Sequence, residues 1–138
     1  MMASTNSCIF CRISNGEIPC HKVYEDAENL AFLDVQPHAQ GHTVIIPKTH
    51  ARSVFELNDQ KYLSLMSAVK KAMKKIQDRL DPDGFNVGWN HNTAGGQVVP
   101  HLHVHIMPRY NGDNGGSIHS IIKNPGKKSV EEVAKLFK

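Results

Sequence analysis

Three histidines alternate with apolar residues in the segment 101–105. A period of two is typical of a β-strand, on which residues i and i+2 point to the same face. The pattern predicts a strand with His101, His103 and His105 on one face and Leu102 and Val104 on the other. Burying three imidazoles together does little for a fold, because each ring brings two nitrogens that need partners. Imidazole titrates near neutral pH, so nucleophilic or acid–base chemistry is favoured over a merely histidine-rich surface, and metal binding stays open.

Length, charge and cysteine content narrow the class of protein. The chain has 138 residues, which suits one domain. Its 16 basic and 13 acidic residues give a net charge of +3, too mild to indicate a nucleic-acid surface. No apolar run approaches about 18 residues, so no membrane partner is expected. Residues 1–7 are expected to be flexible and carry no secretory signal, and the three cysteines do not resemble a disulfide framework. These features favour a reduced, cytoplasmic enzyme-sized domain.

Cys8 and Cys11 form a Cys-x-x-Cys pair, a spacing that zinc sites and redox pairs share. A redox pair is expected to follow a strand, yet only seven residues precede Cys8. A zinc site needs two more ligands, for which histidine complements thiolate. His50 and His101 are the candidates, and a pair of ordinary thiols is the alternative.

Strand-forming runs separated by turn residues predict an antiparallel sheet of about five strands. The expected strands cover 22–25, 30–35, 42–46, 85–90 and 100–107. Asn58 is expected to cap a long helix from Asp59 to about Leu80. The apolar stripe of this helix comprises Leu63, Met66, Val69, Met73, Ile76 and Leu80. Capping-box spacing at Ser129 predicts a short helix near 129–137, inside a variable tail over 111–138. The fold class is therefore α+β.

A glycine pair stands directly before the histidine segment. Gly95 and Gly96 would let the backbone approach a ligand closely, and their successive N–H groups could form an anion-binding nest. The loop before the histidines is therefore a candidate phosphate contact.

The pattern His-φ-His-φ-His-φ-φ over 101–107 resembles the signature of the histidine triad (HIT) family of nucleotide hydrolases and transferases. The resemblance covers roughly Cys8 to Tyr110 and includes the segments 16–19, 32–34, 41–50 and 95–97. It implies a single HIT domain over 1–138, an AMP-like purine nucleotide as substrate, a homodimer paired through the long helix and an adjoining strand, and no organic cofactor.

Some members of the family hold a structural zinc ion with two N-terminal cysteines, a histidine that ends the Pro-Lys-x-His segment and the first histidine of the triad. The resemblance implies such a site here, formed by Cys8, Cys11, His50 and His101. A closed site with four protein ligands leaves no metal-bound water. A catalytic zinc held by the three triad histidines is the competing idea, and it would leave the two cysteines and His50 without a role.

For the reaction, the resemblance implies hydrolysis of nucleoside 5′-phosphoramidates, or of related AMP-linked compounds, through a nucleotidyl-histidine intermediate. His103 would be the nucleophile and His105 would contact the α-phosphate, with His42 and His101 completing the catalytic set. Residues that would hold the base and ribose, with Asp34 on the ribose, are Ile9, Phe10, Ile18, Phe32, Leu33, Asp34 and Val35. Residues that would contact phosphate are Asn90, Gly96, Gln97 and Val98.

Two positions depart from the family pattern. Val98 stands where many HIT hydrolases have serine, and Pro100 stands where an aromatic residue is common. Both departures affect the residues expected to contact the leaving group. His105 stands where the transferase branch tends to have glutamine, which favours hydrolysis. The alternatives are a dinucleoside polyphosphate hydrolase, a nucleotide-binding or scaffold module with little catalytic activity, and a small zinc-binding interaction domain.

Overall fold

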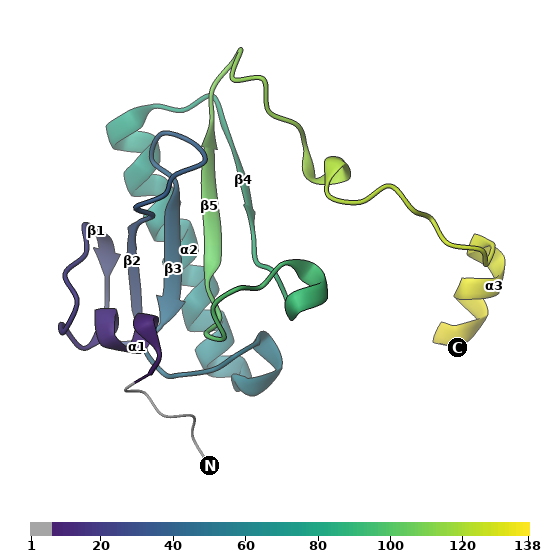
Figure 1. Ribbon diagram of the computed structural model, residues 1–138, viewed down its shortest axis with the longest axis horizontal. Coiled ribbons are helices and arrows are strands. Elements are labelled where there is room, and N and C mark those ends of the chain that lie inside the picture. The colour runs from purple at the N-terminus through teal and green to yellow at the C-terminus, as the bar shows by residue number, and fades with distance from the viewer. Residues whose placement is uncertain (1–6) are drawn as a thin grey trace.

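The computed structural model describes residues 7–138, so the flexible start expected over 1–7 lies, except for Ser7, outside the described residues. A five-stranded antiparallel sheet with the order β1-β2-β3-β5-β4 forms the centre of the domain (Figure 1). The strands are β1 (Lys22–Glu25), β2 (Asn29–Leu33), β3 (Thr43–Pro47), β4 (Gly84–Gly88) and β5 (Val104–Arg109). The helices are α1 (Ile9–Ser14), α2 (Asp59–Leu80) and α3 (Val130–Ala134), joined by the 3-10 turns η1 (Val54–Glu56), η2 (Thr93–Gly95), η3 (Ile118–Ser120) and η4 (Lys135–Phe137). The expected α+β class is confirmed.

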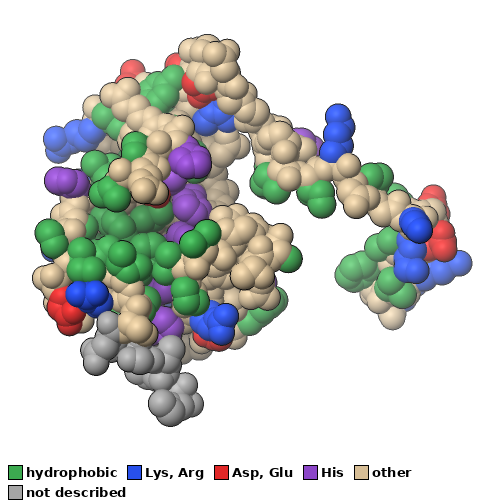
Figure 2. Space-filling view, viewed as in Figure 1, with side chains coloured by type: hydrophobic (Ala, Val, Ile, Leu, Met, Phe, Trp, Pro, Cys, Tyr) green, Lys and Arg blue, Asp and Glu red, His purple; other side chains and the backbone are tan. Residues whose placement is uncertain are grey.

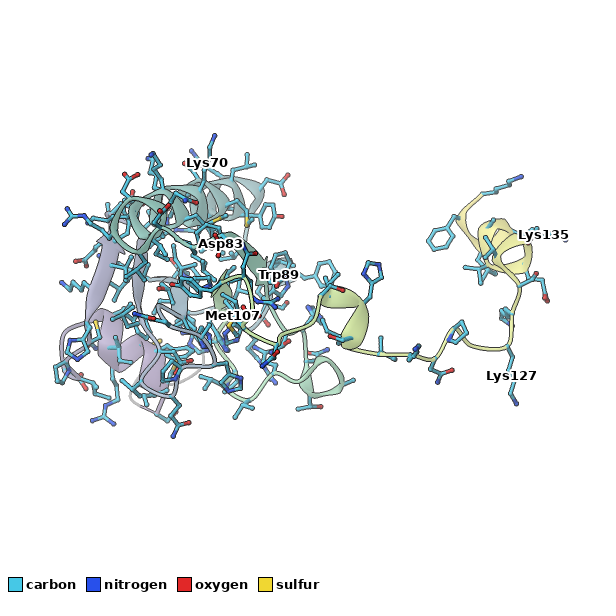
Figure 3. The ribbon with its side chains drawn as sticks, turned by 90° about the horizontal axis from the view of Figure 1, so that it is seen from above. Lys70, Asp83, Trp89, Met107, Lys127 and Lys135 are labelled. Carbon is cyan, nitrogen blue, oxygen red and sulfur yellow. The ribbon has the colours of Figure 1, made fainter. Side chains whose placement is uncertain are left out.

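The sheet is buried on both faces because its central strands alternate their side chains between two hydrophobic clusters. In β3, Ile45 packs with α2, whereas Val44 and Ile46 pack on the opposite face. The face away from α2 is covered by Phe10 and Ile13 of α1. Seen from above, α2 lies on one side of the sheet and α1 on the other (Figure 3). The period of two along the strands thus creates two layers, one of which carries the site.

Helix α2 has the predicted bounds, and the side chain of Asn58 accepts a hydrogen bond from the Lys61 N–H as its cap. Part of the expected stripe is wrong, since Leu63 and Leu80 are 65% and 39% exposed. The buried residues are Leu65, Ala68, Val69, Ala72 and Ile76. The two alanines let the helix lie close to the sheet, and so the contact face is rotated towards these small residues.

The histidine segment behaves as a strand only in part. Ladder pairing begins at Val104, so His101 and His103 precede β5 and only His105 lies on it. The Leu102 N–H donates instead to the Ala51 carbonyl, outside the sheet. The alternation nevertheless holds, because Leu102, Val104 and Ile106 all join the α2 cluster. The three histidines therefore point away from this core as predicted, although the strand is shorter than expected.

Helix α1 was not predicted. Cys8 is its N-cap, and its thiol accepts a hydrogen bond from the Cys11 N–H at 3.4 Å. One turn of helix therefore places both cysteines of the pair at the same end of the domain.

The C-terminal tail leaves the domain as an extended arm that carries Lys127 and Lys135 away from the sheet (Figures 1 and 3). Helix α3 has the predicted capping box between Ser129 and Glu132. No helix among the described residues is long and apolar enough to cross a membrane.

Candidate active site

A cavity of about 930 Å³ opens on the α1 face of the sheet. One end is lined by apolar side chains of α1, of β2 and of the segments beside them: Ile9, Phe10, Ile13, Ile18, Phe32, Leu33 and Val35. Asp34, His42, His103 and His105 line its middle, and Asn90, Gly96 and Val98 continue it. Histidine side chains run down the centre of this face in Figure 2, beside a mainly hydrophobic area. The structure thus brings together all but two of the residues that the sequence assigned to catalysis and nucleotide binding. The first exception is His101, which lies in the adjacent cluster of Cys8, Cys11 and His50.

The second exception is Gln97, which is absent from the cavity lining. Its side-chain oxygen accepts a hydrogen bond from the Asn92 N–H at 2.9 Å, and its side-chain nitrogen donates to the carbonyls of Arg52 and Val99. Gln97 therefore braces the loop with its side chain.

The predicted anion nest at the glycine pair is not formed. The N–H groups of Gly95 and Gly96 donate to the carbonyls of Asn92 and Thr93 within the η2 turn. Gly96 has a φ of 97°, a left-handed conformation that glycine adopts without strain. Neither the Val98 N–H nor the Val99 N–H donates to a group among the described residues, so this part of the loop has free backbone donors.

His103 is 9% exposed, and its Nδ1 lies 2.8 Å from the carbonyl oxygen of His101. A carbonyl only accepts hydrogen bonds, so Nδ1 carries the ring proton and Nε2 keeps a free lone pair. Burial lowers the pKa of His103, and so the ring is neutral at pH 7. The ring of Phe10 meets that of His103 edge-on, with centroids 4.9 Å apart. His103 is therefore held neutral, with a free lone pair on Nε2.

His105 has the opposite tautomer. The His38 N–H donates to Nδ1 of His42 at 3.2 Å, which leaves the proton of neutral His42 on Nε2. That nitrogen lies 3.0 Å from Nδ1 of His105, so His105 carries its own proton on Nε2. Burial, followed by the charges of His103 and His42, lowers the pKa of His105 to about 4. Two neighbouring histidines thus offer one lone pair and one N–H donor.

The carboxylate of Asp34 lies beside this chain of histidines, with Oδ2 3.7 Å from Nε2 of His42. Its other oxygen accepts a hydrogen bond from the Gln36 N–H at 2.9 Å. Burial lowers the pKa of His42 although the Asp34 charge opposes the shift. Asp34, His42 and His105 are close enough to share a cation. A direct hydrogen bond already joins Nε2 of His42 to Nδ1 of His105.

Cys8, Cys11, His50 and His101 form a compact cluster in which the four ligand atoms lie within 4.8 Å of one another. Nδ1 of His101 is 3.3 Å from the Cys8 sulfur, and Nδ1 of His50 is 3.2 Å from the Cys11 sulfur. Nε2 of His101 lies 2.9 Å from the Pro47 carbonyl, so it carries the proton and leaves Nδ1 free to bind a metal.

The chemistry of this cluster fits a metal ion. Burial, with the neighbouring Cys8 thiol, raises the pKa of Cys11 to about 12, and a bound cation would stabilise the thiolate instead. The cluster also argues against one zinc held by the three triad histidines, because His101 faces the cysteines and His105 faces His42. The predicted ligand set is thus assembled as expected, and it could hold a metal.

Sequence reasoning missed one wall of the cavity. Gly116, Ser117, Ile118, Ser120 and Ile121 of the tail line it, together with Val87, Trp89 and Val99. The tail was given no role, and the only signal in its sequence is the turn-forming run over 111–117, which redirects the chain.

Comparisons with known proteins agree with this geometry. The family model described as "HIT domain" matches residues 15–112, and the chain belongs to the HIT family. The chain is similar to adenosine 5′-monophosphoramidase hnt1 of Schizosaccharomyces pombe, with 43% identity over 109 residues, covering 79% of each chain.

Two solved structures extend the similarity. A crystal structure of a HIT family member from Bacillus subtilis has a TM-score of 0.83 and 39% identity, covering 95% of this chain and 92% of that one. A zinc-bound histidine triad family protein from Mycobacterium smegmatis has a TM-score of 0.77 and 31% identity, covering 89% and 86% of the two chains.

Proposed function

We propose that this protein is a HIT hydrolase that cleaves nucleoside 5′-phosphoramidates through a nucleotidyl-histidine intermediate on His103. The observation that carries the proposal is the pair of opposite tautomers in one cavity: His103 presents a lone pair on Nε2, and His105 presents an N–H on its own Nε2. Phosphoryl transfer needs a positioned nucleophile and donors for the charge on the phosphoryl oxygens. The similarity to a yeast AMP phosphoramidase supports the choice of substrate.

In the first step, Nε2 of His103 attacks the α-phosphorus and the bond from phosphorus to the amine nitrogen breaks. The amine leaves with one proton from solvent. The N–H of His105, together with the free Val98 N–H, would stabilise the phosphoryl oxygens during this exchange. The His101 carbonyl keeps Nδ1 of His103 protonated, so the imidazole of the adduct is cationic and a good leaving group.

In the second step, water attacks phosphorus and the bond to Nε2 of His103 breaks. The water gives up one proton, which balances the proton gained by the amine. AMP and free His103 result. The adenine would lie among the apolar residues of α1 and β2, and Asp34 would accept hydrogen bonds from the ribose hydroxyls.

We further propose that the metal of the Cys8, Cys11, His50 and His101 cluster is a structural zinc ion. Two sulfur and two nitrogen donors suit tetrahedral zinc, and the zinc-bound mycobacterial relative supports the choice. Zinc would stabilise the two thiolates and fix α1 against the triad segment. Four side chains of the chain would fill its coordination and leave no position for water or substrate, so it would take no part in the reaction steps.

A homodimer and a cytoplasmic location complete the proposal. Strand β4 is an edge of the sheet. Two apolar side chains are exposed: Val87 on this strand by 37%, and Leu63 on α2 by 65%. An open edge strand beside exposed apolar residues suits pairing with a second copy. Cys8, Cys11 and Cys20 carry free thiols, which suits a reducing compartment.

Hydrolysis of adenosine 5′-phosphoramidate by the purified protein tests the reaction. His103→Ala is expected to lower kcat/KM by at least about 10³-fold, because the nucleophile is lost. His21→Ala, which changes an exposed histidine outside the cavity, is the matched control and should retain parental activity. Parental activity in His103→Ala, with circular dichroism showing an intact fold, would disprove the proposed nucleophile.

A further inference from the structure

Two groups of side chains among the described residues have the spacing to hold a metal ion. One is the cysteine–histidine cluster, and the other is the trio of Asp34, His42 and His105 in the cavity. In the trio, Nε2 of His42 lies 3.0 Å from Nδ1 of His105 and 3.7 Å from Oδ2 of Asp34. Tetrahedral zinc holds its ligand atoms about 3.4 Å apart, so the distances alone would allow an ion in the trio.

The two groups differ in the backbone partner of a histidine ring. In the cysteine–histidine cluster, Nε2 of His101 lies 2.9 Å from the Pro47 carbonyl. The carbonyl accepts the ring proton and leaves Nδ1, which is 3.3 Å from the Cys8 sulfur, free to bind an ion. In the trio, the His38 N–H donates to Nδ1 of His42 at 3.2 Å. This donor holds the ring proton on Nε2, which is the nitrogen that an ion would need.

Metal binding in the trio would therefore disrupt a hydrogen bond. An ion could bind Nε2 of His42 only after the proton had moved to Nδ1 or had left the ring. With the proton on Nδ1, this N–H and the His38 N–H would face each other, and the hydrogen bond between them would be lost. His42 is only 3% exposed, so water does not replace that bond. The His38 N–H thus disfavours an ion in the trio.

The same donor fixes the proton of the next ring. The Nε2–H of His42 donates to Nδ1 of His105, and so His105 keeps its own proton on Nε2. If His42 carried its proton on Nδ1, its Nε2 would only accept, and His105 would have to donate from Nδ1. His105 would then offer a lone pair in place of its Nε2–H. Asp34 lies beyond hydrogen-bonding distance of Nε2 of His42 and acts on this choice only through its charge.

A closed turn presents the His38 N–H to the ring. The His42 N–H donates to the Ala39 carbonyl at 3.1 Å. Gly41 has a φ of 86°, and a Cβ at this position would collide with the side chain of Leu80, so the turn packs closely against the end of α2. The His38 ring is exposed and meets the His42 ring edge-on, with centroids 5.8 Å apart. The contact that sets the tautomer is therefore made by the His38 backbone and not by its imidazole.

We propose that the His38 N–H is a positioning group that disfavours a metal ion in the trio and keeps the proton of His105 on Nε2. Zinc is thereby directed to the cysteine–histidine cluster. An ion in the trio would occupy the carboxylate that the proposed function assigns to the ribose, so its exclusion protects the active site. Only this protective consequence rests on the proposed function, because the tautomers and the choice between the two metal sites hold for any reaction.

The first measurement is the tautomer of each ring in the protein loaded with one equivalent of zinc. Long-range correlation of ring protons with ring ¹⁵N nuclei distinguishes protonated from unprotonated nitrogens. At neutral pH we expect the proton on Nε2 in His42 and His105, and on Nδ1 in His103. A proton on Nδ1 of His42 would overturn the proposal.

His38→Pro removes the backbone donor directly, because proline has no N–H. The dissociation constant for a second equivalent of zinc, measured by competition with a chelating dye, is expected to fall by about 10-fold or more, since the net free energy of one hydrogen bond corresponds to about this factor. His38→Ala removes the ring but keeps the N–H, and it should retain the parental constant. Asp34→Ala combined with His38→Pro should weaken the second ion again, which assigns it to the trio.

The outcomes separate this inference from the proposed function. Equal constants in the parent, in His38→Ala and in folded His38→Pro would overturn it, and so would equal tightening in the two variants. If circular dichroism shows that His38→Pro does not fold, the ring tautomers of the parent decide. Absence of His103-dependent hydrolysis, with the expected tautomers and zinc constants, overturns the proposed function and leaves this inference standing.

Discussion

The carbonyl oxygen of His101 lies 2.8 Å from Nδ1 of His103, while the ring of the same His101 lies 3.3 Å from the sulfur of Cys8. One residue therefore belongs to the cysteine–histidine cluster through its side chain and orients the proposed nucleophile through its backbone. Phe10, between the two cysteines in the sequence, touches both histidine rings edge-on. The cysteine–histidine cluster and the histidines of the cavity therefore form one continuous structure.

Loss of the metal should therefore affect both stability and rate. Cys11→Ser is expected to abolish stoichiometric zinc binding and to lower Tm by about 5 °C or more, because binding to the folded state alone stabilises it. Elemental analysis and thermal unfolding check this result. Cys20→Ser, which changes a cysteine outside the cluster, should bind zinc as the parent does. Equal zinc content and Tm in Cys11→Ser would show that the cluster holds no metal.

Truncation of Phe10 should loosen the nucleophile. Phe10→Ala removes ring contacts with Phe32, His101 and His103. We expect the free energy of unfolding, measured by denaturant titration, to fall by about 1–3 kcal/mol. We also expect kcat to fall by more than the loss of folded protein alone would cause, because His103 is less firmly held. The matched control is Phe55→Ala, since Phe55 is 85% exposed and its loss should change stability by no more than about 0.5 kcal/mol. Similar effects of the two substitutions would contradict the prediction.

Asp34 should discriminate ribose from deoxyribose. Its carboxylate lines the cavity beside His42. Hydrogen bonds from the ribose hydroxyls would favour adenosine over 2′-deoxyadenosine 5′-phosphoramidate by about 10-fold or more in kcat/KM. In Asp34→Ala this ratio should approach one, as measured with both substrates. An unchanged ratio would place the ribose elsewhere.

Acid should destabilise the folded state through the histidine chain. The folded pKa of His105 is about 4 against an ordinary value of 6.5, and the pKa of His42 is also lowered. Between pH 6.5 and about 4 the unfolded chain binds more protons, so the free energy of unfolding decreases as pH falls through this window.

We expect a decrease of about 1–3 kcal/mol, measured by denaturant titration at pH 7 and pH 4.5. His105→Asn keeps an acceptor near the Nδ1 position and should make the free energy of unfolding less dependent on pH. The control His21→Asn changes an exposed histidine and should leave the parental pH dependence. A parental slope in His105→Asn would show that this residue titrates normally.

The sequence by itself determined the local features. Hydrophobic periodicity and the Asn58 cap defined α2, and the alternation around the histidines separated core residues from site residues. The motifs and the family resemblance together also selected Cys8, Cys11, His50 and His101, which the structure brings into one cluster that could hold a metal. The helix, its cap and the alternation depend on neighbours within a few positions along the chain, and therefore local patterns carry them.

Only the tertiary structure decided what each side chain meets. The protonated nitrogen of His101, His103 and His105 depends on Pro47, on the His101 carbonyl and on His42, which the sequence pattern does not specify. The side chain of Gln97 was committed to the loop by Arg52, 45 positions away. The tail isoleucines reach the cavity because Arg109 anchors Gly116 beside β4. Hydrogen bonds between distant segments form only once the sheet has assembled, so the chemistry of this site is a property of the fold.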